Sequence, residues 1–225
     1  MAGTVTALRF QKRQKDRVNV FLDGEYAFSL PGVEAARLQI GQHLTDQEIA
    51  DLQRLGLRSK AYDRALRFLA LRPRSSWEVR RNLGQYRRKE ERLKDEDVEW
   101  VIARLTQQGY LDDQEFARFW VEQRARFKPM APRALRYELR QKGVDEATIQ
   151  AVLSAGEQDP DAAALEAARS RLARWQGLDQ EAFRKKMVAF LQRRGFDWDA
   201  IRGALEQLAQ ERGSNDSSND SPEEM

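Results

Sequence analysis

The stretch LRQKGVDEATIQAVL, residues 139–153, is the most informative about the fold because its pattern returns in LQRRGFDWDAIRGAL, residues 191–205. Both stretches obey L-x3-G-x-D-x3-I-x3-L, and the second follows the first by 52 residues. A glycine at this place ends one helix, an aspartate caps the start of the next, and the aliphatic residues face a common core. The pattern therefore predicts two helix–turn–helix units of the same design.

A weaker copy of this pattern lies upstream. Leu83 ends its helix, a charged insert follows, and Val101 and Leu105 take the isoleucine and leucine places. From Ser59 onward, apolar residues recur at i, i+3, i+4 and i+7, which is the period of an amphipathic helix. Repeats about 50 residues long are typical of stacked supersecondary units. We predict a mainly α fold of three tandem three-helix repeats in an elongated array.

The first part of the chain has a different pattern. Residues 4–10 and 17–22 are rich in β-branched and apolar residues, and a turn signal at 23–24 leads to an alternating stretch at 25–30. We predict a small N-terminal β-meander. Two short helices, over residues 32–37 and 45–54, are expected to cover it, and a capping box opens the second.

These patterns divide the chain into five segments. We predict an N-terminal β-containing extension (1–58), a first repeat (59–109), a second (110–156), a third (157–212) and a tail (213–225). The tail contains four acidic residues and no basic one, and it lacks apolar periodicity. Such a composition cannot bury a core, so the tail is predicted to be a disordered acidic segment.

The charge of the chain is unevenly distributed. The formal net charge is only +3, but basic residues concentrate on the middle helix of each repeat. Equivalent placement in an array would line these helices along one face, and a basic stripe is typical of a protein that binds a polyanion. The candidate binding residues are Arg74, Arg80, Arg81, Arg87 and Arg88 in the first repeat, Lys128, Arg133, Arg136, Tyr137, Arg140 and Lys142 in the second, and Arg184, Lys185, Arg193 and Arg194 in the third.

A simpler explanation competes with this one. A charged helix face is usually a solvated face, and basic residues near a helix C-terminus follow from the helix dipole. The dipole accounts for Arg193 and Arg194, but it does not account for Arg80, Arg81 or Lys185. Recurrence in all three repeats therefore favours the binding hypothesis, with Tyr137 as a candidate for exposed stacking.

Several kinds of chemistry are excluded by composition. The chain has no cysteine, and its single histidine, His43, is expected in a loop. No phosphate-binding glycine loop occurs, and no set of nucleophile, base and metal ligands converges. We expect a protein that is not an enzyme and uses no cofactor or metal. No run approaches the roughly 20 apolar residues of a membrane span, and no signal peptide is evident, so we expect a cytoplasmic monomer.

Three motifs resemble those of one family. The sequence YLDDQEFARFWVEQR, residues 110–124, closely resembles the central signature of the RecX family, bacterial regulators of the RecA recombinase. Residues 74–83 resemble the first-repeat motif of that family, and residues 133–144 resemble the second. The similarity covers residues 62–208, and several members carry an N-terminal β-containing extension. In one departure, KPMAP at 128–132 stands where the family usually has a Lys-Gly-Pro-like turn.

The resemblance implies a fold and a function. It implies three tandem three-helix repeats that bind along the groove of the RecA–single-stranded DNA filament. It further implies inhibition of the ATPase and strand-exchange activities of RecA, limited filament growth, and some direct affinity for DNA, with double-stranded DNA left open as a second ligand. Two alternatives rest on the basic residues alone: a stand-alone DNA-binding helical repeat protein, and a helical scaffold that docks an acidic protein.

Overall fold

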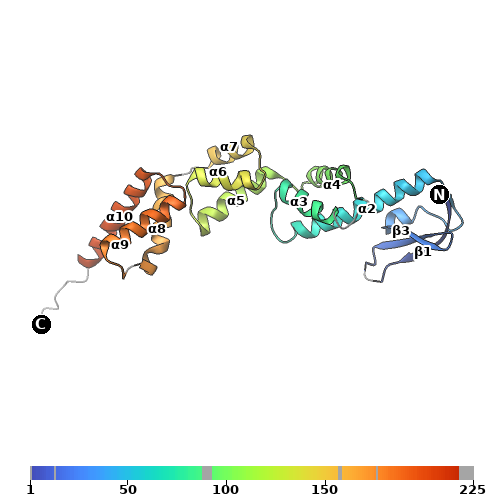
Figure 1. Ribbon diagram of the computed structural model, residues 1–225, viewed down its shortest axis with the longest axis horizontal. Coiled ribbons are helices and arrows are strands. Elements are labelled where there is room, and N and C mark those ends of the chain that lie inside the picture. Colours follow the sequence, from blue (N-terminus) through green and yellow to red (C-terminus); the bar gives the residue numbers. More distant parts are fainter. Residues whose placement is uncertain (1, 13, 88–92, 157–158, 176, 218–225) are drawn as a thin grey trace. The chain divides into compact units, whose positions relative to one another are not determined.

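A computed structural model describes residues 2–12, 14–87, 93–156, 159–175 and 177–217. It confirms a mainly helical chain with an antiparallel sheet at its N-terminus (Figure 1). The chain divides into two compact units, Met1–Asp112 and Asp113–Met225. Each unit contains two clusters of buried apolar residues, one for each module of secondary structure.

The N-terminal sheet has four antiparallel strands in the order β3-β2-β1-β4. Their bounds are Gly3–Phe10 for β1, Arg17–Leu22 for β2, Glu25–Pro31 for β3 and His43–Leu44 for β4. Asp23 and Gly24 have φ angles of 49° and 91°, which suit the tight turn of the β2–β3 hairpin. The predicted meander is confirmed. His43 was expected in a loop, but it lies in β4, which pairs with β1 and was not predicted.

Helix α2 corrects the prediction for the region after the sheet. The short helix α1 spans Gly32–Ala35, and α2 then runs without a break over Asp46–Leu69. The capping box of Thr45 and Glu48 is confirmed. However, the helix does not end near residue 54, so the predicted boundary between residues 58 and 59 falls inside α2.

Gly56 explains how one helix serves two modules. It is buried in α2 where the helix crosses β3, and a Cβ atom at this place would lie 2.3 Å from the carbonyl oxygen of Ser29. The buried face of α2 then changes from Ile49 and Gly56, toward the sheet, to Ala61 and Ala65, toward the first repeat. A single helix therefore contributes to two cores through two different faces.

The first repeat consists of the C-terminal half of α2, α3 (Ser76–Arg87) and α4 (Asp95–Gln107). Leu83, Val101 and Leu105 are 0% exposed, as the weaker copy of the repeat pattern predicts. Gly109, with φ of 75°, ends this repeat.

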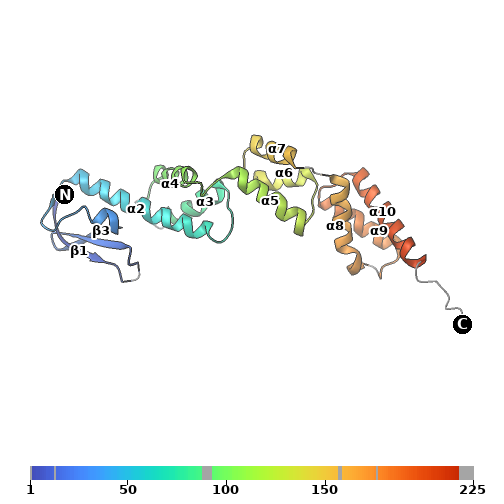
Figure 2. The same ribbon diagram turned by 180° about the vertical axis from the view of Figure 1, so that it is seen from behind.

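The second repeat contains α5 (Asp113–Phe127), α6 (Pro132–Gln141) and α7 (Glu146–Ala155), and the third contains α8 (Pro160–Trp175), α9 (Gln180–Arg193) and α10 (Trp198–Ser217). In the third repeat α8 packs against α10 (Figure 2). Gly143 and Gly195 adopt φ angles of 73° and 88°, and Asp145 and Asp197 cap α7 and α10. The repeat pattern is therefore confirmed in its details.

The predicted tail is partly wrong. Helix α10 continues to Ser217, so residues 213–217 are helical and are not a disordered segment. The rest of the predicted tail, residues 218–225, lies outside the described residues.

Candidate functional site

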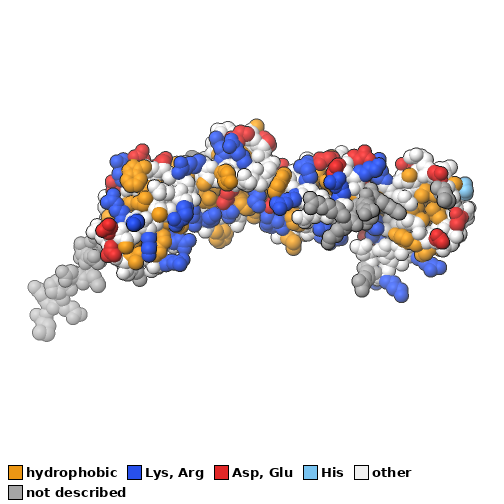
Figure 3. Space-filling model, viewed as in Figure 1, with side chains coloured by type: hydrophobic (Ala, Val, Ile, Leu, Met, Phe, Trp, Pro, Cys, Tyr) orange, Lys and Arg blue, Asp and Glu red, His pale blue; other side chains and the backbone are white. Residues whose placement is uncertain are grey.

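The basic residues predicted on α3 lie against the acidic residues of α4. Arg80 makes two hydrogen bonds to Glu99, from Nε to Oε1 at 2.6 Å and from Nη2 to Oε2 at 2.9 Å. Arg87 Nη1 lies 2.9 Å from Asp95 Oδ2. The hydrogen bonds from Arg80 lower the pKa of Glu99, so this carboxylate stays ionised. Figure 3 shows acidic and basic side chains side by side over α4.

Two other predicted arginines of the first repeat, Arg74 and Arg81, stack on aromatic rings of the same unit. The guanidinium of Arg74 lies 4.0 Å from the ring centre of Phe68, and burial lowers the pKa of this arginine. Arg81 lies 5.3 Å from the ring centre of Trp77, and both residues remain exposed. Arg88 lies outside the described residues. Of these candidates, Arg81 presents its charge most freely.

In the second repeat, two candidates on α6 share one carboxylate on α7. Arg140 Nε donates to Glu146 Oε2 at 2.7 Å, and Arg136 Nε lies 3.5 Å from Glu146 Oε1. The hydrogen bond from Arg140 lowers the pKa of Glu146. Tyr137 is 65% exposed beside this cluster, as a stacking residue requires.

Two further candidates join the second repeat to the third. Arg133 donates to the carbonyl oxygens of Gly195 and Phe196, the latter at 3.0 Å. Arg194 Nη1 donates to Pro129 O at 3.0 Å, and burial lowers the pKa of Arg194. Gly195 allows this close approach, because a Cβ atom there would lie 2.8 Å from the Cβ of Ala134. Arg133 and Arg194 were predicted to bind a partner, but their guanidinium groups are engaged within the protein.

Glu138 on α6 binds a second group of cations, which come from α5 and from the loop that follows it. Its Oε2 atom accepts hydrogen bonds from Trp120 Nε1 at 2.9 Å and Arg124 Nε at 2.6 Å, and Lys128 Nζ lies 3.4 Å from its Oε1. Lys142 Nζ lies 4.8 Å from the ring centre of Trp120. Burial alone would raise the pKa of Glu138, but the bonds from Arg124 and Trp120 outweigh it and the pKa is lowered. An ionised, half-buried carboxylate therefore lies among these cations.

The third repeat has a basic pocket without such a carboxylate. Between α8 and α9 lies a cavity of about 400 Å³, and Figure 3 shows basic side chains gathered over these helices. None of its four cations forms an ion pair with any carboxylate in the described part of the chain. The cavity is lined by the cations Arg171, Arg174, Lys186 and Arg193 and by the aromatic residues Trp175 and Phe190.

The repeat register explains this difference. Asn82, Glu138 and Phe190 each precede the equivalent buried leucine of their middle helix. In the first repeat Arg64 Nε donates to Asn82 Oδ1 at 3.0 Å, and in the second the acceptor is the carboxylate just described. In the third, the guanidinium of Arg171 lies 5.1 Å from the ring centre of Phe190. The same position therefore holds an amide, a carboxylate and an aromatic ring in turn.

Sequence reasoning found only part of this pocket. Arg193 was predicted, and so were Arg184 and Lys185, which are exposed on α9 but do not line the cavity. Lys186 belongs to the basic middle helix but was not among the candidate binding residues, and Arg171 and Arg174 lie on α8, the first helix of the repeat. Aligning the three repeats at their buried leucines would have revealed the missing carboxylate.

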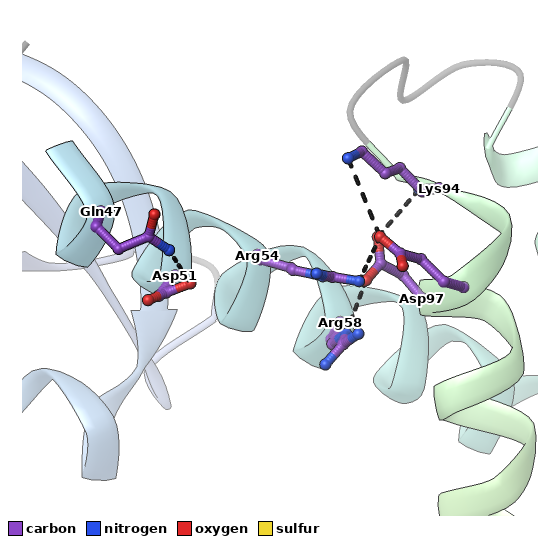
Figure 4. A network of polar contacts seen from close by, with 7 residues as sticks. Gln47, Asp51, Arg54, Arg58, Lys94 and Asp97 are labelled. Atoms are coloured by element: carbon purple, nitrogen blue, oxygen red, sulfur yellow. Dashed lines mark hydrogen bonds and ion pairs between the residues drawn. The ribbon is translucent and has the colours of Figure 1, made fainter.

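A buried carboxylate also organises the first unit (Figure 4). Asp97, which is 1% exposed, accepts hydrogen bonds from Arg54 Nε at 2.8 Å, Arg58 Nε at 2.7 Å and Lys94 N at 3.0 Å. Burial alone would raise its pKa, but the bonds from these donors lower it overall. The network ties α2 to the start of α4, and Arg58 also lies 5.1 Å from the ring centre of Trp100.

A second cavity, of about 740 Å³, lies beside this network. Trp100 and Arg58 line it, and so do Asp51 and Glu34, which oppose the positive charge of the arginines. Two of its three arginines, Arg54 and Arg58, are already paired with Asp97, so this cavity is a weaker candidate for binding a polyanion than the α8–α9 pocket.

The described residues contain no group of three or more His, Cys, Asp or Glu side chains that could hold a metal ion. Within the same residues, no helix is long and apolar enough to cross a membrane.

Tandem helical repeats that pack against their neighbours define the class of helical repeat proteins. Comparison with known sequences gives the family. Residues 3–45 match the regulatory protein RecX N-terminal domain, and residues 61–105, 112–153 and 157–205 match the first, second and third three-helix domains of RecX. The chain belongs to the RecX family of regulatory proteins.

Individual relatives agree. The regulatory protein RecX of Bacillus subtilis (strain 168) is 32% identical over 92% of this chain and 78% of its own length. That of Prosthecochloris aestuarii is 40% identical over 66% of this chain and 93% of its own length. A crystal structure of regulatory protein RecX, with 26% identity, superimposes with a TM-score of 0.67 over 91% of this chain and 99% of its own.

Proposed function

We propose that this chain regulates a RecA recombinase by binding the filament that RecA forms on single-stranded DNA. In this proposal it is a cytoplasmic, non-catalytic monomer that needs no cofactor, and it inhibits the ATPase and strand-exchange activities of RecA, limiting filament growth. Family membership and the three motifs support the RecA partner. The observation that carries the DNA part is the α8–α9 pocket, whose cations have no carboxylate partner among the described residues.

The predicted residues contribute unequally in this proposal. Exposed cations without a described ion pair, Arg81 on α3 and Arg184 and Lys185 on α9, are free to meet an acidic surface or phosphate. Arg80 and Arg140 must first break an ion pair with a carboxylate of this chain before they can bind an acidic group of the partner, so each contributes less net free energy to binding.

The test measures ATP hydrolysis by the cognate RecA on single-stranded DNA while this chain is added. We expect inhibition at fewer than one chain per RecA subunit, because a filament-directed regulator blocks growth at few sites. Unchanged hydrolysis at every ratio would contradict the proposal. The chain alone is expected to hydrolyse no ATP, and its elution volume on size exclusion should match a monomer.

A stand-alone DNA-binding protein is the second candidate, because the same pocket would serve it without RecA. The two are separated by binding measurements at a salt concentration that abolishes binding to bare DNA. A RecA regulator still associates with the preformed filament under these conditions, since protein contacts are less sensitive to salt than phosphate contacts. A DNA-binding protein does not. Binding to RecA in the absence of DNA, without effect on hydrolysis, would instead favour a scaffold that docks an acidic protein.

A further inference from the structure

We infer that the α8–α9 pocket of the third repeat is a single-strand nucleic acid site, in which the cations hold phosphates and Trp175 stacks on an unpaired base. This inference rests on the proposed function and names the part of the molecule that meets the DNA strand. The first observation is the positive charge of the pocket. Arg174, Lys186 and Arg193 are exposed, and none of them forms an ion pair with a described carboxylate.

The aromatic residues of the pocket select the kind of nucleic acid. Trp175 is half-buried at the C-terminal end of α8, and its ring centre lies 5.7 Å from that of Phe190, at an interplanar angle of 86°. Phe190 is 7% exposed and is packed by Arg171 and Arg194, whose guanidinium groups lie 5.1 Å and 4.8 Å from its ring centre. Phe190 thus supports the pocket floor, and Trp175 is the ring with surface left to offer.

Aromatic rings beside a track of cations are the usual means of holding single strands. A duplex keeps its bases stacked inside and would present only phosphates to this pocket, so the indole would contribute nothing. The volume of about 400 Å³ lies within the roughly 300–1,000 Å³ of pockets that hold one small ligand. It therefore fits a single nucleotide better than the surface of a duplex.

Fluorescence anisotropy of a labelled dT15 strand, without RecA and at several salt concentrations, measures the affinity of the full chain for single-stranded DNA. The double variant Arg174→Ala/Lys186→Ala should weaken binding about tenfold at low salt. It should also reduce the slope of log K against log salt by about 1.4, which corresponds to two phosphate contacts on a single strand. The matched control Arg118→Ala/Arg202→Ala removes the same charge from exposed positions outside the pocket, and should change affinity less than twofold.

Stacking is tested separately with an abasic strand of the same length. Wild type should bind dT15 about tenfold more tightly than the abasic strand, because stacking adds to the phosphate contacts. Trp175→Leu should erase this preference, and Trp175→Phe should retain most of it. Thermal unfolding followed by circular dichroism shows whether each variant is folded, and a preference lost only in Trp175→Leu is not explained by a general loss of stability.

Three results would overturn the inference. The first is equal weakening of dT15 binding by the pocket variant and the control variant. The second is equal affinity of wild type for dT15 and for a hairpin duplex, together with no effect of Trp175→Leu. The third is displacement of the labelled strand by poly-glutamate at concentrations similar to those at which unlabelled dT15 displaces it. Measuring ATP hydrolysis by RecA with the same variants distinguishes failure of the proposed DNA site from failure of the proposed regulatory function. A pocket variant that still inhibits RecA, together with failure of these DNA measurements, rejects the site and leaves the regulatory function standing.

Discussion

The α5–α6 pair of the second repeat and the α8–α9 pair of the third share one helical design, but they differ in the residue that precedes the buried leucine of the middle helix. In the second repeat this residue is Glu138, which accepts hydrogen bonds from Trp120 and Arg124 and so compensates the cations around it. In the third repeat Phe190 takes the equivalent place, and the cations around it face solvent without a described carboxylate partner. In the proposed binding site, the residue at this position therefore distinguishes a repeat whose cations are paired within the fold from one whose cations remain available to an anion.

The number of basic residues on a helix does not give the charge that the helix can offer to a partner. Arg80 and Arg140 look as free in the sequence as Lys186, yet carboxylates on the following helix neutralise the first two. What matters is where acidic residues on neighbouring helices meet the basic ones. That is a property of packing, and the sequence of one helix does not contain it.

The greatest loss of stability is expected on substitution of Asp97, the buried carboxylate of the first unit. Asp97→Asn leaves Arg54 and Arg58 without their buried acceptor charge, and removing one partner of a buried pair typically costs about 3–5 kcal/mol. We expect a loss near the lower figure, because Arg54 is partly exposed. Urea denaturation gives the total loss, and hydrogen exchange should place it in α2 and α4.

The control for this variant is Glu99→Gln, which breaks the surface pair with Arg80 and should cost no more than about 0.5 kcal/mol. If Asp97→Asn and Glu99→Gln lowered the free energy of unfolding equally, burial of Asp97 would not strengthen its ion pairs, and the contrast between buried and surface carboxylates would be wrong.

Glu138→Gln should have the next largest effect. The amide cannot compensate Arg124 and Lys128, and an unsatisfied buried group costs about 1–3 kcal/mol. We expect about 2 kcal/mol in the free energy of unfolding at neutral pH, measured by denaturant titration. Asn82→Ala, which removes the uncharged acceptor of Arg64 in the first repeat, is the matched comparison and should cost less. A larger loss in Asn82→Ala would reverse the proposed ranking.

The same carboxylate predicts a pH dependence. The folded-state pKa of Glu138 is lowered, so its stabilising contribution is complete above the unfolded-state pKa and is lost as the pH falls through the folded-state value. The free-energy gap between wild type and Glu138→Gln should therefore shrink as the pH is lowered from about 7 toward about 3. If the difference in unfolding free energy between wild type and Glu138→Gln stayed constant over this range, the charge of Glu138 would not be what stabilises the contact between α5 and α6.

How far the sequence predicts this protein depends on the feature. Leu139, Gly143 and Asp145 could be placed because local rules of helix termination, capping and period fix them. The continuity of α2 could not, because its buried face changes at Gly56 and the apolar stripe is interrupted there. In the third-repeat pocket, Arg171 escaped prediction because its importance depends on what another helix places opposite it.

A smaller effect concerns binding in the second repeat. If Glu138 withholds the cations between α5 and α6 from DNA, then Glu138→Gln should free Arg124 and Lys128 and raise affinity for dT15 by roughly threefold. The gain should disappear in high salt, since it comes from charge. Anisotropy titrations of wild type and variant measure it, and the Asn82→Ala variant should show no gain. An unchanged affinity would mean that the residue at this position does not control access to the cations.

The smallest effect separates two arginines that look alike in the sequence. Arg140→Ala removes a side chain paired with Glu146, and it should leave both the denaturation midpoint and the affinity for dT15 unchanged within error. Arg193→Ala removes a pocket cation without a described carboxylate partner, and it should weaken binding about threefold while leaving stability unchanged. Both variants lose one positive charge, so a shared reduction would reflect net charge alone. A reduction only in Arg193→Ala would show that binding depends on where the charge lies and on whether the fold has already paired it.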